Sequence, residues 1–282
     1  MQTVTTKAEL HAALQQARQQ GQSIGLVPTM GNLHQGHLSL VTAAVSECDF
    51  TVATIFVNPL QFGENEDLQS YPRTLAQDQE MLAAAGCKLL FAPAVSEMYG
   101  ENLASRTVVH VTGLSERYCG ESRPGHFDGV ATVVTKLFHL VAPKRAYFGL
   151  KDFQQFRIIQ QLVAELDFSL ELRGIPTMRE DSGLAMSSRN NYLSEEQRKT
   201  ASGLFRTLEQ TGQQIIGGCQ EFRRLEREAV QKLDAAGIKP DYFAICNART
   251  LDLANPGDPQ LVLLAAGYVD AVRLIDNLSV KP

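Results

Sequence analysis

Residues 23–57 read SIGLVPTMGNLHQGHLSLVTAAVSECDFTVATIFV, and this stretch decides the predicted fold. A short apolar segment, Ser23–Val27, has the pattern of a strand that ends at Pro28, and Leu38–Ser46 continues as a helix. Phe50–Val57 is β-branched and apolar throughout, which is typical of a strand buried on both faces. A buried strand, a helix and a second buried strand in this order indicate a parallel sheet.

The same alternation continues to about residue 175. The expected segments are a helix Thr74–Ala85, a strand Lys88–Phe91, a candidate strand Val108–Val111, a helix Val130–Val141, a strand Arg145–Phe148, a helix Asp152–Leu166 and a strand Leu170–Ile175. The predicted fold class is therefore α/β, with a Rossmann-like, doubly wound parallel sheet. Ligands bind outside the carboxyl ends of the strands in such sheets, so residues directly after each strand are the first candidates for a site.

The pattern changes at about Pro176. A capping-box sequence, Ser194–Gln197, opens a helix over 195–211, and a charged helix is expected over 219–236. Three strand candidates follow: Tyr242–Cys246, Leu261–Ala265 and Ala271–Ile275. We predict a Rossmann-like domain over 1–176 and a small α+β domain over 177–282, packed with a cleft between them because no flexible linker joins them.

Composition excludes several classes of protein. The 282 residues carry 26 Lys and Arg against 31 Asp and Glu, and the resulting net charge of −5 disfavours a nucleic-acid-binding surface over the whole protein. No apolar run is long enough to span a bilayer, and the polar N-terminus has no secretory apolar region. Five cysteines without a C-x-x-C pair are typical of a reduced, cytoplasmic protein and predict no cysteine-based zinc site.

The strongest chemical signal is the segment Pro28–His37, directly after the first strand. Gly31 allows a tight turn into the helix, and Gly36 leaves room for a ligand to approach the backbone. His34 and His37 share one face of the first helical turn, where backbone N–H groups and both imidazoles can face a phosphate. Either histidine alone would more often be a satisfied core residue, but the pair with two glycines favours a site. A zinc site would need a third ligand, and the sequence offers no obvious one.

Three further segments carry chemistry. Phe56–Gly63 places amides after the second buried strand, although an ordinary Asn-Pro turn would look the same. Gly149–Gln155 offers Lys151 to phosphates, while Asp152 also suits a helix N-cap. Met186–Asn190 joins two hydroxyls to a guanidinium, which fits a polyphosphate clamp or a solvated loop.

The H-x-G-H stretch resembles the superfamily of adenylyl-transferring enzymes that includes class I aminoacyl-tRNA synthetases and small nucleotidyltransferases. The motifs taken together resemble the pantothenate synthetase, or pantoate–β-alanine ligase, family. They are spread over roughly residues 20–195 in family order and spacing. The matching stretches are PTMGNLHQGH (28–37), FVNPLQF (56–62), YPRT (71–74), RPGHFDGV (123–130), GLKDFQQ (149–155) and GLAMSSRN (183–190).

The resemblance implies an AMP-forming ligase of pantothenate (vitamin B5) and coenzyme A biosynthesis that uses ATP and Mg²⁺. The carboxylate of (R)-pantoate attacks the α-phosphorus of ATP to give pantoyl adenylate and pyrophosphate. The amine of β-alanine then displaces AMP. The domain over 1–176 would bind the nucleotide and pantoate, and the domain over 177–282 would be a lid that carries the Met186–Asn190 loop. The resemblance also implies a homodimer formed through the N-terminal domain.

The resemblance assigns roles residue by residue. His37, His34, Lys151 and Arg189 would be catalytic, with His37 as a proposed proton donor, although charge stabilisation matters more than a proton for a phosphate. The implied ATP contacts are Met30, Gly31, Asn32, Leu33, His34, Gln35, Gly36, His37, Gly149, Leu150, Lys151, Asp152, Met178, Met186, Ser187, Ser188 and Arg189. Gln61, Gln155 and Asn58 would bind or support pantoate, and Gln61 would also contact β-alanine. Asp78 matches a magnesium-linked carboxylate or is a charged residue on a solvated helix.

Two positions depart from the family pattern. Leu150 stands where a Glu is usual, and an extended chain there would turn its side chain away from the ligand. Met178 replaces a more usual Val at an implied backbone contact. Arg123 and His126 are assigned to a mobile lid.

Alternatives to the ligase stay open. One is a nucleotidyltransferase that stops at an adenylylated compound, against which FVNPLQF and Gln155 argue. Another is a tRNA-linked enzyme, which the acidic balance disfavours. A third is a non-catalytic nucleotide-binding protein, which the combination of His34, His37 and Lys151 with the Ser-Ser-Arg run disfavours.

Overall fold

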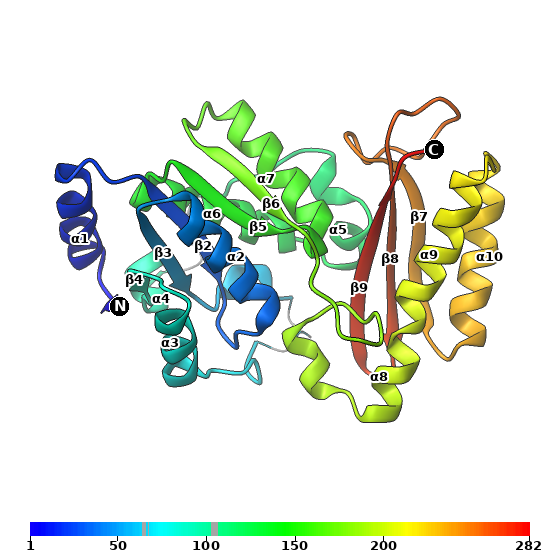
Figure 1. Cartoon of the computed structure of the whole chain (residues 1–282), viewed down its shortest axis with the longest axis horizontal. Helices are drawn as coiled ribbons and strands as arrows, with labels where there is room; N and C mark the ends of the chain where they lie inside the picture. The colour runs from blue at the N-terminus through cyan, green and yellow to red at the C-terminus, as the bar shows by residue number, and fades with distance from the viewer. Residues whose placement is uncertain (64–65, 67, 103–106) are drawn as a thin grey trace. The chain divides into compact units, whose positions relative to one another are not determined.

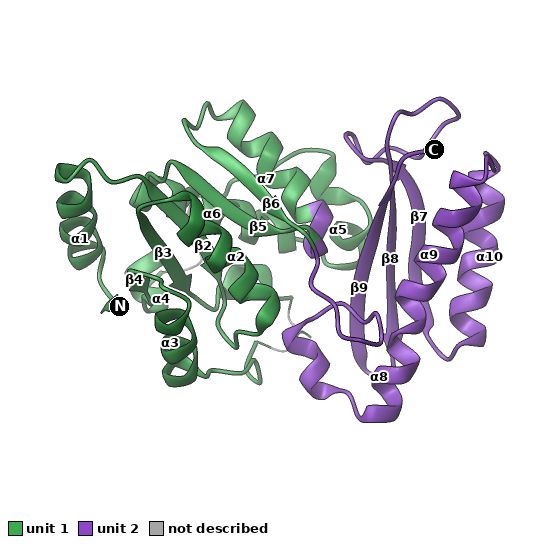
Figure 2. Cartoon of the chain, viewed as in Figure 1, with its two compact units in different colours: residues 1–150, 155–176 green, residues 151–154, 177–282 purple. Residues whose placement is uncertain are grey.

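The computed structural model describes residues 1–63, 66, 68–102 and 107–282. The chain divides into two compact units: residues 1–150 with 155–176, and residues 151–154 with 177–282 (Figure 2). The predicted first domain includes residues 151–154, but in the structure these residues group with the second unit. One physical reason is that the side chain of Asn277 donates a hydrogen bond to the Lys151 carbonyl at 2.8 Å.

Strands and helices alternate from residue 1 to residue 176 (Figure 1). In chain order they are β1 (Gln2–Val4), α1 (Lys7–Gln19), β2 (Ile24–Thr29), α2 (Gln35–Glu47), β3 (Phe50–Ile55), the 3-10 turn η1 (Pro59–Gln61), α3 (Leu75–Ala84), β4 (Leu89–Phe91), α4 (Val95–Tyr99), η2 (Leu114–Glu116), α5 (Cys119–Ser122), α6 (His126–Val141), β5 (Arg145–Gly149), η3 (Leu150–Asp152), α7 (Phe153–Glu165) and β6 (Glu171–Ile175).

The described strands of this region form one parallel sheet in the order β1-β4-β3-β2-β5-β6. This confirms the predicted doubly wound α/β class. The chain moves outward from β2 through β3 to β4, then returns to β5 on the other side of β2. The strand order therefore reverses between β2 and β5, and the crevice at such a reversal is where ligands bind in open α/β sheets. The H-x-G-H segment follows β2, and Gly149 ends β5.

Some local predictions differ from the structure. The segment Val108–Val111 forms no strand, because the Val109 N–H donates to the hydroxyl of Thr132 on α6 at 2.9 Å instead of entering a ladder. The short elements β1, α4 and α5 were not predicted, since three to five residues show too little periodicity to be recognised.

The second unit packs helices on an antiparallel sheet. Its described elements beyond residue 177 are η4 (Ser188–Tyr192), α8 (Glu195–Ala201), α9 (Gly203–Ile216), α10 (Phe222–Ala235), β7 (Lys239–Asn247), β8 (Leu261–Val269) and β9 (Val272–Val280), with the strands in the order β7-β8-β9. The single helix expected over 195–211 is two helices that meet at Ser202. The Ser202 hydroxyl donates to the Lys199 carbonyl at 2.7 Å, a local bond that competes with the regular helix.

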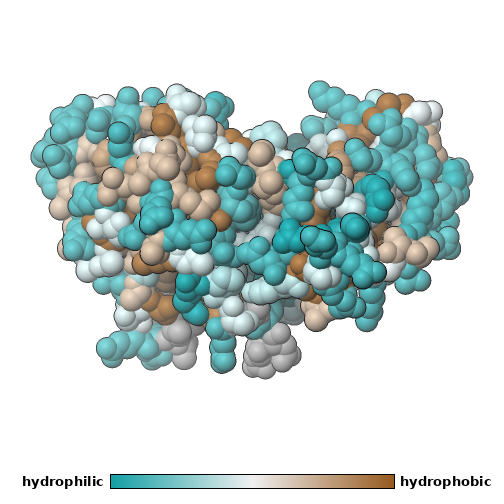
Figure 3. All heavy atoms as spheres, turned by 60° about the horizontal axis from the view of Figure 1, so that its bottom comes forward, coloured by the Kyte–Doolittle hydropathy of each residue, from teal (hydrophilic) through white to brown (hydrophobic). Residues whose placement is uncertain are grey.

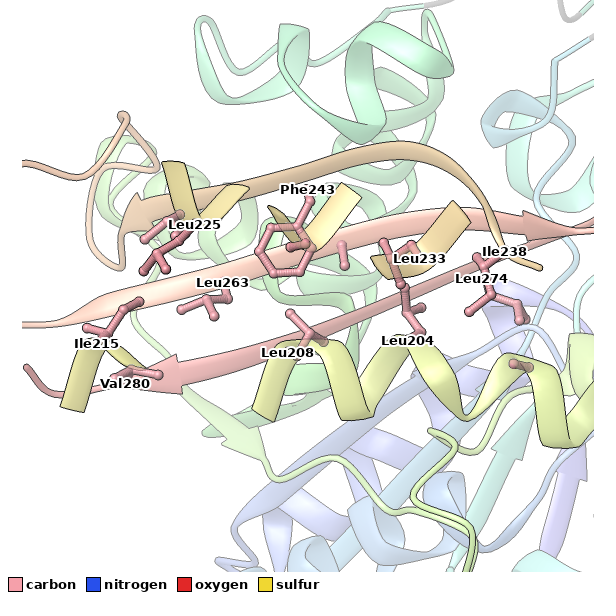
Figure 4. Close-up of a cluster of buried hydrophobic side chains, with 14 of the residues drawn as sticks. Leu204, Leu208, Ile215, Leu225, Leu233, Ile238, Phe243, Leu263, Leu274 and Val280 are labelled. Carbon is pink, nitrogen blue, oxygen red and sulfur yellow. The ribbon is translucent and has the colours of Figure 1, made fainter. Parts of the chain in front are cut away.

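The core of the second unit lies between this sheet and α9 and α10 (Figure 4). Leu204 and Leu208 of α9 and Leu233 of α10 are buried against strand residues such as Leu263 and Phe243. The central strand β8 is buried along almost its whole length. This packed layer gives β9 a rigid position, which matters for the residues that β9 holds.

On the molecular face drawn in Figure 3, hydrophilic and hydrophobic residues are interspersed. Among the described helices, none is both long and apolar enough to cross a membrane.

Candidate functional site

The turn after β2 is built on two successive left-handed residues. Gly31 has φ +83° and Asn32 has φ +51°. A Cβ at Gly31 would lie 3.0 Å from both the Asp78 carboxylate and the Ile55 side chain, so glycine is required by space as well as by φ. The Thr29 hydroxyl accepts the Gly31 N–H at 3.2 Å and donates to the Thr54 carbonyl at 2.6 Å.

Asp78 anchors this turn from helix α3. Its Oδ1 accepts the Leu33 N–H at 2.8 Å, and its Oδ2 accepts the Asn32 N–H at 2.9 Å and the Thr74 hydroxyl at 3.1 Å. The residue is only 1% exposed. A buried carboxylate is stable when such charge-assisted hydrogen bonds compensate its desolvation. The carboxylate therefore fixes the shape of the loop that carries the two histidines.

His34 and His37 form a capping box at the first turn of α2. His34 is the N-cap residue: its Nδ1 accepts the Gly36 N–H at 3.1 Å, and the His37 Nδ1 accepts the His34 N–H at 3.4 Å. The two ring centroids lie 4.1 Å apart. A nitrogen that accepts a hydrogen bond carries no proton, so this geometry assigns both rings the neutral tautomer with the proton on Nε2.

The expectation that backbone N–H groups of this turn would face a phosphate is wrong for most of the segment. The N–H groups of Asn32 and Leu33 go to Asp78, and those of His37 and Leu38 go to the His34 carbonyl. The Asp78 side chain and the His34 carbonyl thus satisfy these donors inside the protein. Most backbone N–H groups of this turn are therefore already bonded within the protein, and the two imidazoles stay the predicted ligand contacts.

The amides after β3 form a second buried cluster. Asn58 is 1% exposed, and its Nδ2 donates to the Gln61 Oε1 at 3.2 Å and to the Gly129 carbonyl at 3.0 Å. Its Oδ1 accepts the Tyr99 hydroxyl at 2.9 Å. The Gln61 Nε2 lies 3.0 Å from the Met30 sulfur. Asn58 thus orients Gln61, and Gln61 contacts Met30 in the segment that carries the two histidines.

Helix α6 approaches this cluster closely at one glycine. A Cβ at Gly129 would lie 2.2 Å from the Leu60 carbonyl oxygen, so no other residue fits there. Arg123, just before α6, and His126, the first residue of α6, are the two residues predicted to belong to a lid. The His126 Nδ1 lies 2.7 Å from the Gln61 carbonyl, and the Arg123 guanidinium pairs with Glu66, with Nε 2.7 Å from its carboxylate. The Arg123 Nη2 also donates to the Gln61 carbonyl at 3.4 Å, so both residues support the backbone of Gln61.

The chain after β5 is not extended, contrary to the expectation at Leu150. Leu150–Asp152 forms the 3-10 turn η3. The Leu150 side chain nevertheless packs against strand β6, because Gly174 there has no Cβ: one would lie 2.6 Å from the Leu150 Cδ2 and 3.0 Å from Phe156. The Nζ of Lys151 lies 3.6 Å from the Asp152 carboxylate. Gln155, the other predicted pantoate residue, is half-buried in α7.

In the second unit, residues 178–186 form a hairpin that leads into the Ser-Ser-Arg run. The Met186 N–H donates to the Met178 carbonyl at 2.9 Å, so two predicted ATP contacts are backbone partners. Ser187 caps η4 by accepting the Arg189 N–H at 3.3 Å. Asn190 is buried, and its Nδ2 donates to the Glu180 carboxylate at 2.9 Å, which holds the run against the hairpin.

The residues present do not form a ready magnesium site. Both oxygens of Asp78 already accept hydrogen bonds from the protein, which favours a loop anchor over the predicted metal ligand. Among the described residues, no group of three or more His, Cys, Asp or Glu side chains could hold a metal ion. Mg²⁺ is commonly bound through substrate phosphates with one or two carboxylates rather than by an all-protein cage.

Several supporting residues were missed by sequence reasoning. Thr29, Thr74 and Tyr99 each contribute one hydroxyl hydrogen bond, to Gly31, Asp78 and Asn58 respectively. A single hydroxyl residue in a sequence does not by itself indicate such a supporting role. The helical spacing of Thr74 and Asp78, four residues apart at the start of a predicted helix, was the one pattern that could have pointed to the anchor.

Comparisons with known proteins identify the family of the chain. The family model described as pantoate-beta-alanine ligase matches residues 2–279. The pantothenate synthetase of Pseudomonas aeruginosa (strain UCBPP-PA14) is 54% identical over 280 residues, covering 99% of each chain.

Solved structures extend the likeness to three dimensions. The crystal structure of pantothenate synthetase from Thermus thermophilus has a TM-score of 0.93 and 47% identity over 100% of both chains. Pantoate-beta-alanine ligase from Francisella tularensis, complexed with beta-gamma ATP and beta-alanine, has a TM-score of 0.83 and 34% identity over 99% of this chain and 97% of that one. With the motifs, the sheet order and the matched length in agreement, the chain belongs to the pantoate-beta-alanine ligase family.

Proposed function

We propose that the chain condenses (R)-pantoate with β-alanine, with ATP converted to AMP and pyrophosphate, through a pantoyl-adenylate intermediate. Family membership over nearly the whole chain supports this reaction. The observation that supports the residue assignment most directly is the capping box formed by two neutral imidazoles. His34 and His37 form it directly after β2. The ATP and β-alanine in the Francisella relative fit the same reaction.

In the first step, a pantoate carboxylate oxygen forms a bond to the α-phosphorus of ATP. The bond from that phosphorus to the bridging oxygen breaks, and pyrophosphate leaves with the electron pair. His34 and His37 donate hydrogen bonds from Nε2 to the phosphates, whose charge develops in the transition state. The neutral tautomer makes charge stabilisation, rather than release of a proton from His37, the role of these rings.

Lys151 and Arg189 are the further cations that we assign to the phosphates. Lys151 contacts the phosphates as a mobile point charge, and Arg189 with Ser187 and Ser188 binds them through a guanidinium and hydroxyls. Gly149, Leu150 and Asp152 line the same turn, and Met178 with Met186 contacts the nucleotide. We also propose that residues 177–282 act as a lid.

Pantoate and β-alanine are assigned to the amide cluster. Gln61 and Gln155 bind pantoate, Gln61 also contacts β-alanine, and Asn58 orients Gln61 from beneath. In the second step the β-alanine amine attacks the acyl carbon, the acyl–phosphate bond breaks, AMP leaves with that electron pair, and the nitrogen loses a proton to solvent. Adenylation is needed because a free carboxylate is a poor acyl donor.

Mg²⁺ is proposed to enter as its complex with ATP, held by the phosphates of the nucleotide. We further propose a homodimer formed through residues 1–176, which sedimentation equilibrium tests. A cytoplasmic location is supported by the five cysteines, all of which lie in described residues and are free thiols.

Pyrophosphate–ATP exchange without β-alanine tests the reaction. We expect exchange that requires pantoate, followed by release of AMP and pantothenate when β-alanine is added. Exchange independent of pantoate, or an adenylylated product that β-alanine does not consume, would support a nucleotidyltransferase instead. ATP binding without any exchange would contradict the ligase assignment.

A further inference from the structure

Two adjacent residues of β9, Asp276 and Asn277, are polar and buried. They are 4% and 8% exposed. Burial of a carboxylate and an amide is costly unless each is hydrogen-bonded, so both need specific partners. Successive side chains leave a strand on opposite faces, so one dipeptide can reach two different segments.

Asn277 reaches the lysine turn. Its Nδ2 donates to the Lys151 carbonyl at 2.8 Å, although the two residues are 126 positions apart. This bond acts on the backbone of Lys151 and leaves the ammonium group to other partners. Because β9 is packed in the core of the second unit, the bond ties the lysine turn to that unit.

Asp276 reaches the 178–186 hairpin. The guanidinium of Arg179 binds its carboxylate through two nitrogens, at 2.6 and 2.9 Å. The same guanidinium donates to the Gly183 carbonyl at 3.0 Å and lies 3.5 Å from the ring centroid of Phe205. The two hydrogen bonds and the ring contact fix the orientation of the guanidinium. Arg179 therefore anchors the 178–186 hairpin.

The geometry points to Asp276 and Asn277 as positioning residues that hold Lys151 and the 178–186 hairpin in one fixed arrangement for ATP. Neither residue touches substrate in this role. A lysine on a flexible stem loses less freedom on binding when its backbone is already fixed, and the hairpin carries Met178 and Met186 as backbone partners. This inference rests on the proposed function of Lys151 and the hairpin in binding ATP.

The test compares Asn277→Ala with a matched control, Asn247→Ala. Asn247 lies on β7 of the same sheet and also anchors a loop: its Nδ2 donates to Asp258 at 2.7 Å, and its Oδ1 accepts the Arg249 N–H at 2.9 Å. Both variants are expected to lose similar stability in chemical denaturation. Only Asn277→Ala should raise the KM for ATP in pyrophosphate exchange, by about twofold to tenfold for one lost hydrogen bond, with the KM for pantoate unchanged.

A second variant covers the case in which Asn277→Ala does not fold. Asn277→Asp keeps the size of the side chain but directs a carboxylate oxygen at the Lys151 carbonyl, so it should raise the KM for ATP more than the alanine variant does. Equal ATP kinetics in the Asn277 variants and the control would overturn the positioning role. Absence of exchange in the unmodified chain would instead overturn the proposed function, so the two failures are distinguishable.

Discussion

The carboxylate of Asp78 accepts the backbone N–H of Leu33 at 2.8 Å, across 45 positions of sequence. The same carboxylate accepts the Asn32 N–H, so a buried anion from α3 occupies backbone donors that a phosphate could otherwise use. The loop therefore binds an internal anion that fixes its shape, and the imidazoles remain its proposed contacts with the ligand.

Asp78→Asn tests the anchor. The amide keeps one acceptor but faces a backbone N–H with its own NH₂ group, so we expect a loss of about 1–3 kcal/mol in the free energy of unfolding and a marked fall in pyrophosphate exchange. Glu80→Gln, at an exposed position of the same helix, should change neither. Urea denaturation and exchange assays measure both effects.

The magnesium dependence of the same variant separates the two roles of Asp78. An anchor predicts that the Mg²⁺ concentration giving half-maximal exchange is unchanged in Asp78→Asn. Rescue of that variant by excess Mg²⁺ would show that the carboxylate is a metal ligand after all.

His34→Asn and His34→Ala separate capping from chemistry. Asn is a good N-cap residue, so His34→Asn should keep the stability of α2, whereas His34→Ala should lose roughly 1 kcal/mol. Both variants lack the Nε2–H donor, and exchange should fall about 10²- to 10³-fold in each. Exchange that survives in His34→Asn would contradict a role for the ring beyond the cap.

Asn58→Asp tests the support beneath Gln61. The carboxylate cannot donate to the Gln61 Oε1 or to the Gly129 carbonyl, so Gln61 should lose its orientation. We expect the KM for pantoate to rise about tenfold, the equivalent of roughly 1.4 kcal/mol, with little change in the KM for ATP. Tyr99→Phe removes only the hydroxyl that donates to Asn58 and should have a smaller effect in the same steady-state assay.

His110 predicts a small pH dependence of stability. Its hydrogen bond with Asp128, at 2.8 Å, raises the pKa of His110, and Glu116 lies 3.4 Å from its other nitrogen. A raised pKa means that the folded state favours the charged ring. The stabilisation is therefore fully present below the unfolded value of about 6.5 and is lost as pH rises through the higher folded value.

The measurement compares denaturation midpoints of the unmodified chain and Asp128→Asn at low and high pH. The difference should be small, because 44% of the His110 side chain is exposed to solvent, and it should shrink as pH rises. A difference that grows with pH would contradict the assigned sign.

Local sequence pattern determined the α/β class, most strand and helix positions and the family. Buried strands such as β3 are continuous apolar runs, and the motifs follow the strands directly, so short-range periodicity carries this information. The pairing of His34 with His37 also lies within one helical turn, where i, i+3 spacing is visible in the sequence.

Only the tertiary structure decided how these motifs are held. Asp78 reaches Leu33, Asn58 reaches Gly129, and Asn277 reaches Lys151, each across tens of residues or more. In the structure, the Val109 N–H in the expected strand Val108–Val111 bonds to α6 instead, and Lys151 belongs to the second unit. Hydrogen bonds between distant residues depend on how the packed elements bring their atoms within about 3 Å, and no local pattern in the sequence encodes that proximity.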